Sequence, residues 1–412
     1  MIKTSLAIPE IGWSLQVCGA NACGLMHVLI AADKFKDSLT AAQACDAIAL
    51  GLKHAHPEWV ADLCPLTDGG EGFAHILTDA AQGEWVRMEV AGPRGKQMEA
   101  GFGVVEAARL PGAVLQRLGC ACGGRLAVIE MAAASGLALL RHDERDVWQT
   151  HTGGTGALMA AAAEMDVEGI LLGVGGSATH DLGLGALAAL GLELLDADGR
   201  CVSSAAPGFW KQVARVEAGR LRKLPPIRIA CDVTNPLLGP RGAATVYGPQ
   251  KGLQPEALPR LEAESARLAA LVCASRGVAV ELAQTPGAGA AGGISFGLMA
   301  VAGARLVSGF ELVSDWLRIE QRLAAADLVI TGEGRFDESS VQGKGPGSLV
   351  RAALALGKPV HVFAGRVDAV EMPGMRLHEI TPRGVPLEQA LAKAGLWLEE
   401  SAAAAFGVRM AD

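Results

Sequence analysis

The sequence predicts an α/β protein of two domains, one of them a doubly wound parallel sheet built from both ends of the chain. At 412 residues the chain exceeds the roughly 250–300 residues at which a single hydrophobic core stops growing. Near both chain ends, short apolar runs alternate with helical patterns, as in a parallel sheet. Glycine-rich loops follow several of these runs, at the strand ends where such sheets bind ligands.

The first strand is predicted over the apolar residues 26–31, and Ser38 or Thr40 is expected to cap the helix that follows. The apolar stripe of that helix is Ala41, Ala44, Ile48 and Leu52. A second strand near 61–64 leads through a glycine-rich loop into a helix over 72–81. This repetition of strand, loop and helix indicates parallel pairing.

The pattern changes after residue 84 and returns to the parallel rhythm near residue 287. The alternation over 85–90 and 98–105 predicts a hairpin around a turn at 92–95. Further strands of the middle part are 128–131, 169–174 and 227–232. The elements predicted in the last part are a strand at 327–330, a helix at 349–356 and a strand at 359–364.

We therefore expect a doubly wound domain over residues 26–83 and 285–412, interrupted by a mixed α/β domain over 84–284. Residues 1–25 carry no ordered pattern and are expected to be an N-terminal extension, either disordered or a misassigned start. Because ligands of such sheets lie at strand ends, the site is expected in the cleft between the two domains.

Composition excludes some classes of function. The formal net charge of −8 and the single tyrosine, Tyr247, do not favour nucleic-acid binding, which needs basic surfaces and stacking side chains. No segment is apolar and long enough to suggest a membrane span. The nine cysteines follow no CxxC spacing, so reduced thiols in a cytoplasmic protein are the simple interpretation.

Four glycine-rich loops carry the candidate chemistry. They are 68–72 (DGGEG), 173–185 (GVGGSATHDLGLG), 287–293 (GAGAAGG) and 331–337 (TGEGRFD). A strand followed by such a loop and a helix presents free N–H groups to an anion. Because three of the four loops also contain carboxylates, the set predicts a site for a phosphorylated ligand and a metal ion.

In the loop 68–72, the glycines admit a ligand close to the backbone. Asp68 and Glu71 suit a hydrated Mg²⁺ or a hydroxylated substrate. A tight turn in which both carboxylates cap the next helix explains the same residues.

In the loop 173–185, the hydroxyls of Ser177 and Thr179 are expected to donate to a phosphate. Asp181 stands where it would accept a proton from an alcohol or hold a metal ion, although a plain helix cap fits it equally well. His180 is more simply a solvated polar side chain, with a catalytic role as the minor alternative.

Asp232 lies at a predicted strand end, and Asn235 is held by the following proline; an Asx-turn is the alternative. Arg335 would bind a phosphate with two parallel hydrogen bonds, and Lys36 and Lys344 are further candidate cations. The chain lacks both the GxxxxGK[ST] pattern of P-loop enzymes and the protein-kinase signatures.

With these motifs in place, the sequence resembles the bacterial type I glycerate kinase family from Met26 to its end. The motifs that carry the resemblance are ADKFKDSLTA (32–41), PLTDGGEG (65–72), IEMAAASGL (129–137), GVGGSATHD (173–181), CDVTNPLLGPRGA (231–243), YGPQKG (247–252), PGAGAAGG (286–293), ITGEGRFD (330–337), QGKGP (342–346) and ITPRGVPLEQAL (380–391). The family often has asparagine at the position of His180 and two glycines at Leu182 and Gly183.

The resemblance implies a flavodoxin-like domain with an inserted mixed-sheet domain. It also implies Mg²⁺-assisted, ATP-dependent phosphorylation of D-glycerate, with the 2-hydroxyl favoured. Asp181 or Asp68 is expected to accept the hydroxyl proton, aided by Lys36. The carboxylates expected on the metal side are Asp232, Glu333 and Asp337. The residues expected to bind substrate or phosphate are Asp33, Gly69, Gly70, Glu71, Gly175, Gly176, Ser177, Thr179, Asn235, Arg335 and Lys344. A cytoplasmic enzyme with no nucleic-acid or membrane partner is expected, and a homodimer is the assembly considered.

Two other classes of protein stay open at this point. A Rossmann-type oxidoreductase shares the strand–loop–helix elements, but no GxGxxG follows the first strand, and the loop carboxylates would repel a pyrophosphate without metal. A non-catalytic sensor of small molecules on the same fold would be favoured by missing carboxylates, and none is missing.

Overall fold

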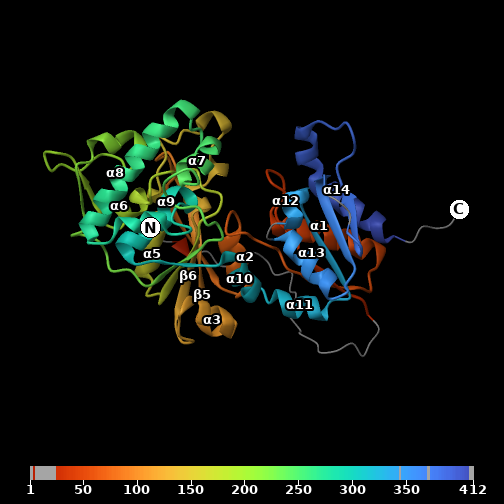
Figure 1. Cartoon of the computed structure of the whole chain (residues 1–412). Helices are drawn as coiled ribbons and strands as arrows, with labels where there is room; N and C mark the ends of the chain where they lie inside the picture. The colour runs from red at the N-terminus through yellow and green to blue at the C-terminus, as the bar shows by residue number, and fades with distance from the viewer. Residues whose placement is uncertain (1–2, 5–24, 343–344, 369–371, 408–412) are drawn as a thin grey trace. The chain divides into compact units, whose positions relative to one another are not determined.

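The computed structural model describes residues 3–4, 25–342, 345–368 and 372–407, which form two units (Figure 1). The first unit comprises the described residues within Met1–Leu6 and Gly69–Leu312, and the second those within Ala7–Asp68 and Val313–Asp412. From residue 25 onward the chain passes from one unit to the other twice, between residues 68 and 69 and between residues 312 and 313.

The second unit is built on a five-stranded sheet in which all neighbouring strands are parallel. Its strands are β2 (His27–Ile30), β3 (Val60–Leu63), β12 (Leu328–Phe336), β13 (Val360–Val367) and β14 (Met375–Glu379). They lie in the order β14-β13-β12-β2-β3, the flavodoxin-like arrangement in which the second strand in the chain flanks the first on the outside. The predicted fold class is confirmed, because strands from both ends of the chain form one parallel sheet.

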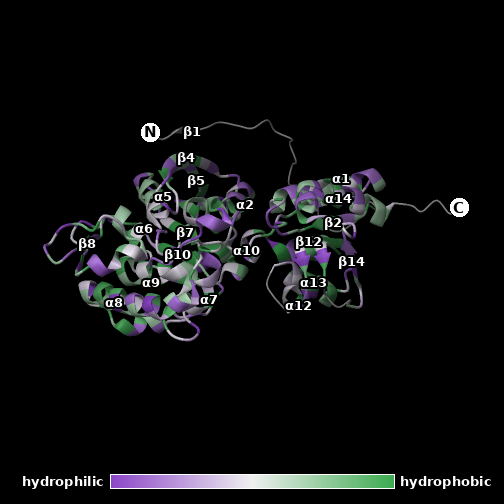
Figure 2. Ribbon diagram, turned by 90° about the horizontal axis from the view of Figure 1, so that it is seen from above, coloured by the Kyte–Doolittle hydropathy of each residue, from purple (hydrophilic) through white to green (hydrophobic). Residues whose placement is uncertain are grey.

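Helices cover both faces of this sheet. They are α1 (Ala41–Ala55), α11 (Ile319–Ala325), α12 (Glu338–Gln342), α13 (Pro346–Ala355) and α14 (Leu387–Phe406). Figure 2 shows α1 and α14 on one face and α12 and α13 on the other. Thr40 caps α1 by accepting a hydrogen bond from Gln43 N, and the predicted stripe of that helix is buried. Ile48 and Leu52 pack in one core with Leu398 of α14.

The first unit contains a seven-stranded mixed sheet in the order β1-β4-β5-β6-β7-β10-β11. Its strands are β1 (Lys3–Thr4), β4 (Glu84–Ala91), β5 (Gln97–Glu106), β6 (Arg125–Glu130), β7 (Gly169–Gly173), β10 (Ile227–Ala230) and β11 (Arg305–Val307). The antiparallel pair β4 and β5 is the predicted hairpin, and β6, β7, β10 and β11 run parallel. A separate pair consists of β8 (Glu193–Leu195) and β9 (Arg215–Glu217).

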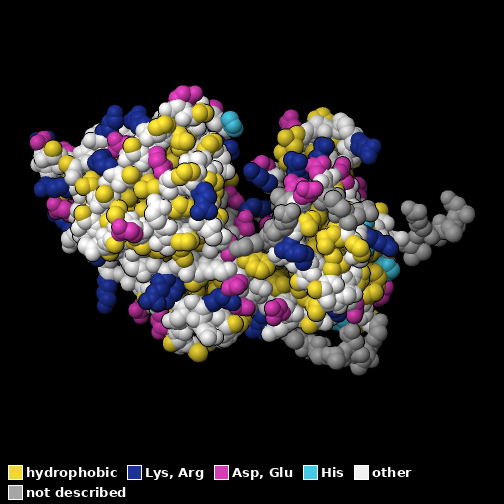
Figure 3. All heavy atoms as spheres, viewed as in Figure 1, with side chains coloured by type: hydrophobic (Ala, Val, Ile, Leu, Met, Phe, Trp, Pro, Cys, Tyr) yellow, Lys and Arg dark blue, Asp and Glu magenta, His cyan; other side chains and the backbone are white. Residues whose placement is uncertain are grey.

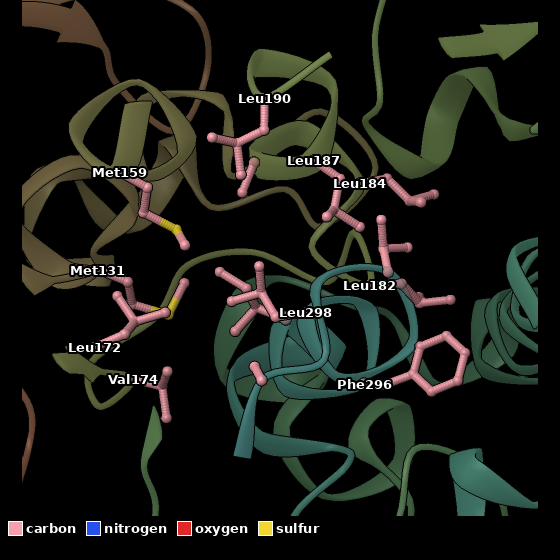
Figure 4. Close-up of a cluster of buried hydrophobic side chains, with 14 of the residues drawn as sticks. Met131, Met159, Leu172, Val174, Leu182, Leu184, Leu187, Leu190, Phe296 and Leu298 are labelled. Carbon is pink, nitrogen blue, oxygen red and sulfur yellow. The ribbon is translucent and has the colours of Figure 1, made fainter. Parts of the chain in front are cut away.

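The helices of the first unit are α2 (Phe73–Ala80), α3 (Gly112–Leu118), α4 (Ala132–Ser135), α5 (Gly153–Glu164), α6 (Leu184–Ala189), α7 (Ala243–Tyr247), α8 (Leu258–Arg276) and α9 (Ala290–Ala302), and α10 (Gly309–Trp316) spans the second passage between the units. Figure 4 shows side chains of β7, α5, α6 and α9 gathered in the apolar core, among them Leu172, Leu187 and Leu298. This core fixes the start of α6 and of α9, and the glycine-rich loops that precede them are fixed with it.

Segments 69–83 and 285–312 belong to the first unit, where α2 packs on β5 and β6, and α9 packs on α6 and α8. The predicted domains over 26–83 with 285–412 and over 84–284 stay a prediction. The predicted extension over residues 1–25 lies outside the described residues, apart from β1, which pairs with β4, and Leu25.

Surface and thiol properties were also predicted from composition. On the face shown in Figure 3, basic and acidic side chains are interspersed. Across the described ranges, no helix combines the length and apolarity needed to cross a membrane. The seven cysteines within these ranges are free thiols.

Candidate functional site

In the five-stranded sheet, the chain continues on opposite sides of β2, first to β3 and later to β12. Ligands of such sheets bind at the carboxyl ends of the strands beside this switch point. Asp33 lies there, because its N–H extends the pairing of β2 by donating to Gly332 O at 2.8 Å. Glu333 belongs to β12, and Asp337 directly follows that strand. This edge of the sheet therefore collects three of the predicted site carboxylates.

Asp33 and Asp337 affect the protonation of Glu333. Burial raises the pKa of Glu333 to about 7; the hydrogen bond with Ser340 opposes this rise, and the charges of Asp33 and Asp337 add to it. In the part of the chain that the structure describes, the buried Oε1 of Glu333 has no hydrogen-bond partner. An orphaned carboxylate oxygen beside two further carboxylates fits a hard cation with oxygen ligands.

The predicted cations lie at the same end of the second unit but differ in their partners. Lys34, which sequence reasoning did not select, places Nζ 3.5 Å from Oδ1 of Asp68, whose side chain is 59% exposed. Lys36 is exposed, and Arg335 pairs with Asp368 at 2.8 Å. The remaining cation, at position 344, lies outside the described residues.

In the first unit, the loop before α2 and the loop after β7 lie against each other. Gly175 N donates to Gly69 O at 2.9 Å, and a Cβ added at Gly175 would come 2.6 Å from Gly70 N. Gly176 has a φ of +69°, and a Cβ there would lie 2.5 Å from a carboxylate oxygen of Glu71. A side chain at either glycine would push these two predicted loops apart, so they form one glycine-lined surface.

Asp181 is fully buried at the end of the second loop. Its Oδ2 accepts hydrogen bonds from Thr152 N at 2.7 Å, Thr152 Oγ1 at 2.8 Å and Gly185 N at 3.0 Å. Its Oδ1 accepts one from Gly183 N at 3.1 Å. Burial raises the pKa of Asp181, and the hydrogen bonds from Thr152 and Gly185 oppose that rise. This geometry is that of the helix-cap alternative, because the donors belong to the starts of α5 and α6; the role as proton acceptor stays a prediction.

Ser177 and Thr179 of this loop accept hydrogen bonds from a residue that sequence reasoning did not select. Lys251, which is 1% exposed, donates from Nζ to Ser177 Oγ at 2.8 Å and to Thr179 O at 2.6 Å. Ser177 is 7% exposed, whereas Thr179 is fully buried and its hydroxyl has no partner among the described residues. Of the two hydroxyls, that of Ser177 is therefore the one with access to a ligand.

Asp232 and Asn235 use their polar atoms within the first unit. Asp232 accepts hydrogen bonds from Phe310 N at 2.7 Å and Ser308 Oγ at 3.2 Å, so it caps the start of α10. Asn235 donates to Arg241 O at 2.8 Å and accepts from the Tyr247 hydroxyl at 2.7 Å. Their predicted roles toward metal and substrate stay predictions. Within the described ranges, no group of three or more His, Cys, Asp or Glu side chains is placed to hold a metal ion.

The model of the "Glycerate kinase family" matches residues 28–409. The chain belongs to this family. The "Glycerate kinase" of Bacillus subtilis (strain 168) is 39% identical over 386 residues, which cover 92% of this chain and 96% of that protein. The "Glycerate 2-kinase" of Escherichia coli (strain K12) is 37% identical over 82% of this chain and 85% of its own length. The solved structure described as "Crystal structure of putative glycerate kinase 2 from Salmonella typhimurium LT2" superposes with a TM-score of 0.71 at 38% identity, covering 93% of this chain and 98% of that one.

As a family member, the chain is an enzyme of the phosphotransferase class, as its resemblance implied.

The structure adds Glu130, which is 7% exposed and accepts hydrogen bonds from Gly72 N at 3.2 Å and Ala74 N at 2.8 Å. Glu130 thus caps α2 from β6, a role that the sequence offered to Asp68 and Glu71. An acidic residue that ends an otherwise apolar strand is the signal that could have identified it.

His180 gives this family member a testable response to acid. The side chain is fully buried, and its Nε2 lies 3.0 Å from Ser265 Oγ. Burial, together with the charge of Lys251, lowers its pKa to about 3. The histidine is therefore not the solvated residue expected from the sequence. In the unfolded chain it binds a proton near pH 6.5, so the free energy of unfolding falls as the pH drops from about 6.5 toward 3.

Replacing His180 with asparagine is expected to remove this dependence. Between pH 6 and pH 4, urea unfolding should show a slope smaller by about 1.4 kcal/mol per pH unit in H180N than in the unchanged enzyme. Equal slopes in the two proteins would show that His180 is protonated in the folded state. His142Asn, at an exposed position, serves as the matched control.

Proposed function

We propose that this enzyme transfers the γ-phosphoryl group of ATP to D-glycerate, with 2-phosphoglycerate as the favoured product. The observation that carries the proposal is the family match over residues 28–409. The name of the Escherichia coli relative, "Glycerate 2-kinase", supports the choice of the 2-hydroxyl. A location in a cleft between two domains, a homodimer and a cytoplasmic enzyme stay predictions.

The chemistry needs a proton acceptor, charge neutralisation and positioning. The 2-hydroxyl oxygen would form a bond to the γ-phosphorus, the bond from that phosphorus to the bridging oxygen would break, and ADP would leave. Asp68 is proposed to take the hydroxyl proton, because its carboxylate is exposed at the carboxyl end of β3. Asp181 is less suited to accept this proton, because its carboxylate already accepts hydrogen bonds from the starts of α5 and α6 and has no exposed surface.

The cation Lys34, beside Asp68, would orient that carboxylate before the proton moves. The loop after β7 would bind an anionic oxygen through Ser177 and its backbone N–H groups. Glu333 and Asp337 would hold Mg²⁺, which binds proteins through one or two carboxylates when phosphates complete its ligand shell. When bound, Mg²⁺ neutralises the charge that develops on the phosphate oxygens.

Phosphorus NMR of the enzyme with ATP, Mg²⁺ and D-glycerate tests the proposal. The expected result is loss of the γ-phosphate signal of ATP and growth of the 2-phosphoglycerate signal. A 3-phosphoglycerate signal would keep the kinase activity but reverse the position of transfer. Unchanged ATP with D-glycerate and with related hydroxy acids would contradict the proposal.

A further inference from the structure

Lys251 is a buried cation without a role in the chemistry proposed above. It ends the short 3₁₀ helix Pro249–Lys251, and only 1% of its surface is exposed. Burying an ammonium group is costly unless hydrogen bonds and opposite charges compensate for the lost water. Its ammonium group faces two acceptors in the loop after β7, Ser177 Oγ and Thr179 O, and the charge of Asp181 stabilises it. The neighbouring His180 has a lowered pKa and is therefore neutral.

The hydrogen bond from Lys251 fixes the direction of a hydroxyl. Burial lowers the pKa of Lys251 to about 7, and the charge of Asp181 opposes this fall, so the side chain is an ammonium group below that pH. An ammonium group has no acceptor, so in the contact at 2.8 Å the Ser177 oxygen accepts and the lysine donates. The hydrogen of Ser177 must then point away from Lys251. Among the described residues, Ser177 Oγ donates a hydrogen bond to no partner, and the residue keeps 7% of its surface exposed. That hydrogen is available to a ligand.

The backbone of the same loop is held by other contacts. Gly175 N donates to Gly69 O at 2.9 Å, Leu137 N donates to Gly176 O at 2.7 Å, and Ala178 N donates to Ser135 O at 2.8 Å. Because these hydrogen bonds flank Ser177 on both sides, the path of the loop does not depend on Lys251 alone. What depends on Lys251 is the orientation of the hydroxyl and a positive charge that the loop itself lacks.

We propose that Lys251 is a positioning residue that orients the Ser177 hydroxyl as a hydrogen-bond donor to an anionic oxygen of a ligand bound at the loop after β7. That oxygen belongs to a carboxylate or to a phosphate. The inference rests on the proposed function, which supplies one ligand of each kind: D-glycerate and ATP. Lys251 acts through Ser177 and does not itself touch the ligand.

A double-mutant cycle tests this. Calorimetry would measure the Kd of D-glycerate, and separately of a non-hydrolysable ATP analogue with Mg²⁺, for the unchanged enzyme, S177A, K251M and the double variant. Each single variant is expected to raise one of the two Kd values about 10-fold, the scale of one hydrogen bond to a charged group. The double variant should raise it by about the same factor, because one interaction is lost in all three. At saturating substrate, kcat should fall much less than the affinity.

The two ligands separate the sources of the anionic oxygen: a change for D-glycerate assigns a carboxylate, and a change for the ATP analogue assigns a phosphate. Unchanged Kd values in K251M, or a roughly 100-fold increase in the double variant, would overturn the proposal. The proposal would also be overturned if S177A left both Kd values unchanged while K251M lost kcat, affinity and thermal stability together, since that pattern indicates a structural role for Lys251. Lys211Met, at an exposed lysine, is the control. If the unchanged enzyme does not bind D-glycerate, the proposed function fails. The Kd values for the ATP analogue would still test the coupling between Ser177 and Lys251.

Discussion

Replacing Asp68 with asparagine is expected to lower kcat by roughly 10²–10⁴, the usual contribution of a positioned general base. Asparagine has nearly the same shape but cannot take up the hydroxyl proton. The side chain is 59% exposed, so the substitution should leave the free energy of unfolding within about 0.5 kcal/mol of its original value. The KM values for D-glycerate and ATP should change little, because the hydrogen-bonding capacity of the side chain is retained.

Steady-state kinetics with a coupled assay for ADP would measure this effect. Asp198 offers a matched control, because it is 67% exposed and pairs with Arg200 at 2.8 Å, much as Asp68 pairs with Lys34. Asp198Asn should retain full activity. A loss below tenfold in D68N would remove Asp68 from the proton transfer and favour Asp181 as the proton acceptor.

Replacing Asp181 with alanine is expected to lower the free energy of unfolding by about 4 kcal/mol. The carboxylate satisfies three backbone N–H groups and one hydroxyl, all of them buried. Each buried donor left without a partner costs roughly 1–3 kcal/mol, partly relieved where a water enters the space. Urea unfolding, followed by circular dichroism, would measure the loss. A change below about 1 kcal/mol would show that the carboxylate is not needed to join α5 and α6.

Asp181Asn then separates the cap from the base. The amide NH₂ group of the new asparagine would meet a hydrogen-bond donor, so some free energy of unfolding should be lost. The amide oxygen would still accept hydrogen bonds in the folded enzyme. If Asp181 is a cap only, kcat per folded enzyme should fall less than tenfold. A fall of roughly 10²–10⁴ would favour the role as proton acceptor and oppose the assignment to Asp68.

Much of the fold followed from local pattern. The stripe of α1, the hairpin of β4 and β5 and the glycine-rich loops at strand ends are set by residues that lie close together in the sequence. The pairing of β12 with both β2 and β13 also agrees with the expected doubly wound sheet. In these places hydrophobic spacing and turn residues carry enough information to choose the element.

The details of the site depended on contacts between distant residues. Asp181 meets Thr152, which is 29 positions away, and only that contact reveals that its carboxylate is saturated. Glu130 reaches the start of α2 across 56 positions, and Lys251 reaches Ser177 across 74. No periodicity links such pairs, so sequence reasoning could select the residue types but not which atoms would satisfy one another.

The parallel sheet of the second unit has a consequence for biosynthesis. Thr331 Oγ1 donates to Ala31 O, and these two positions are 300 residues apart. At the usual rate of about 5–20 residues per second, the ribosome needs roughly 15–60 s to make the strand that β2 requires as a neighbour. Residues 69–312 are continuous in the chain and emerge within that interval. Although β2 gains β3 as a neighbour early, its other edge waits for β12, and a nascent chain that stalls before β12 exposes that unpaired edge.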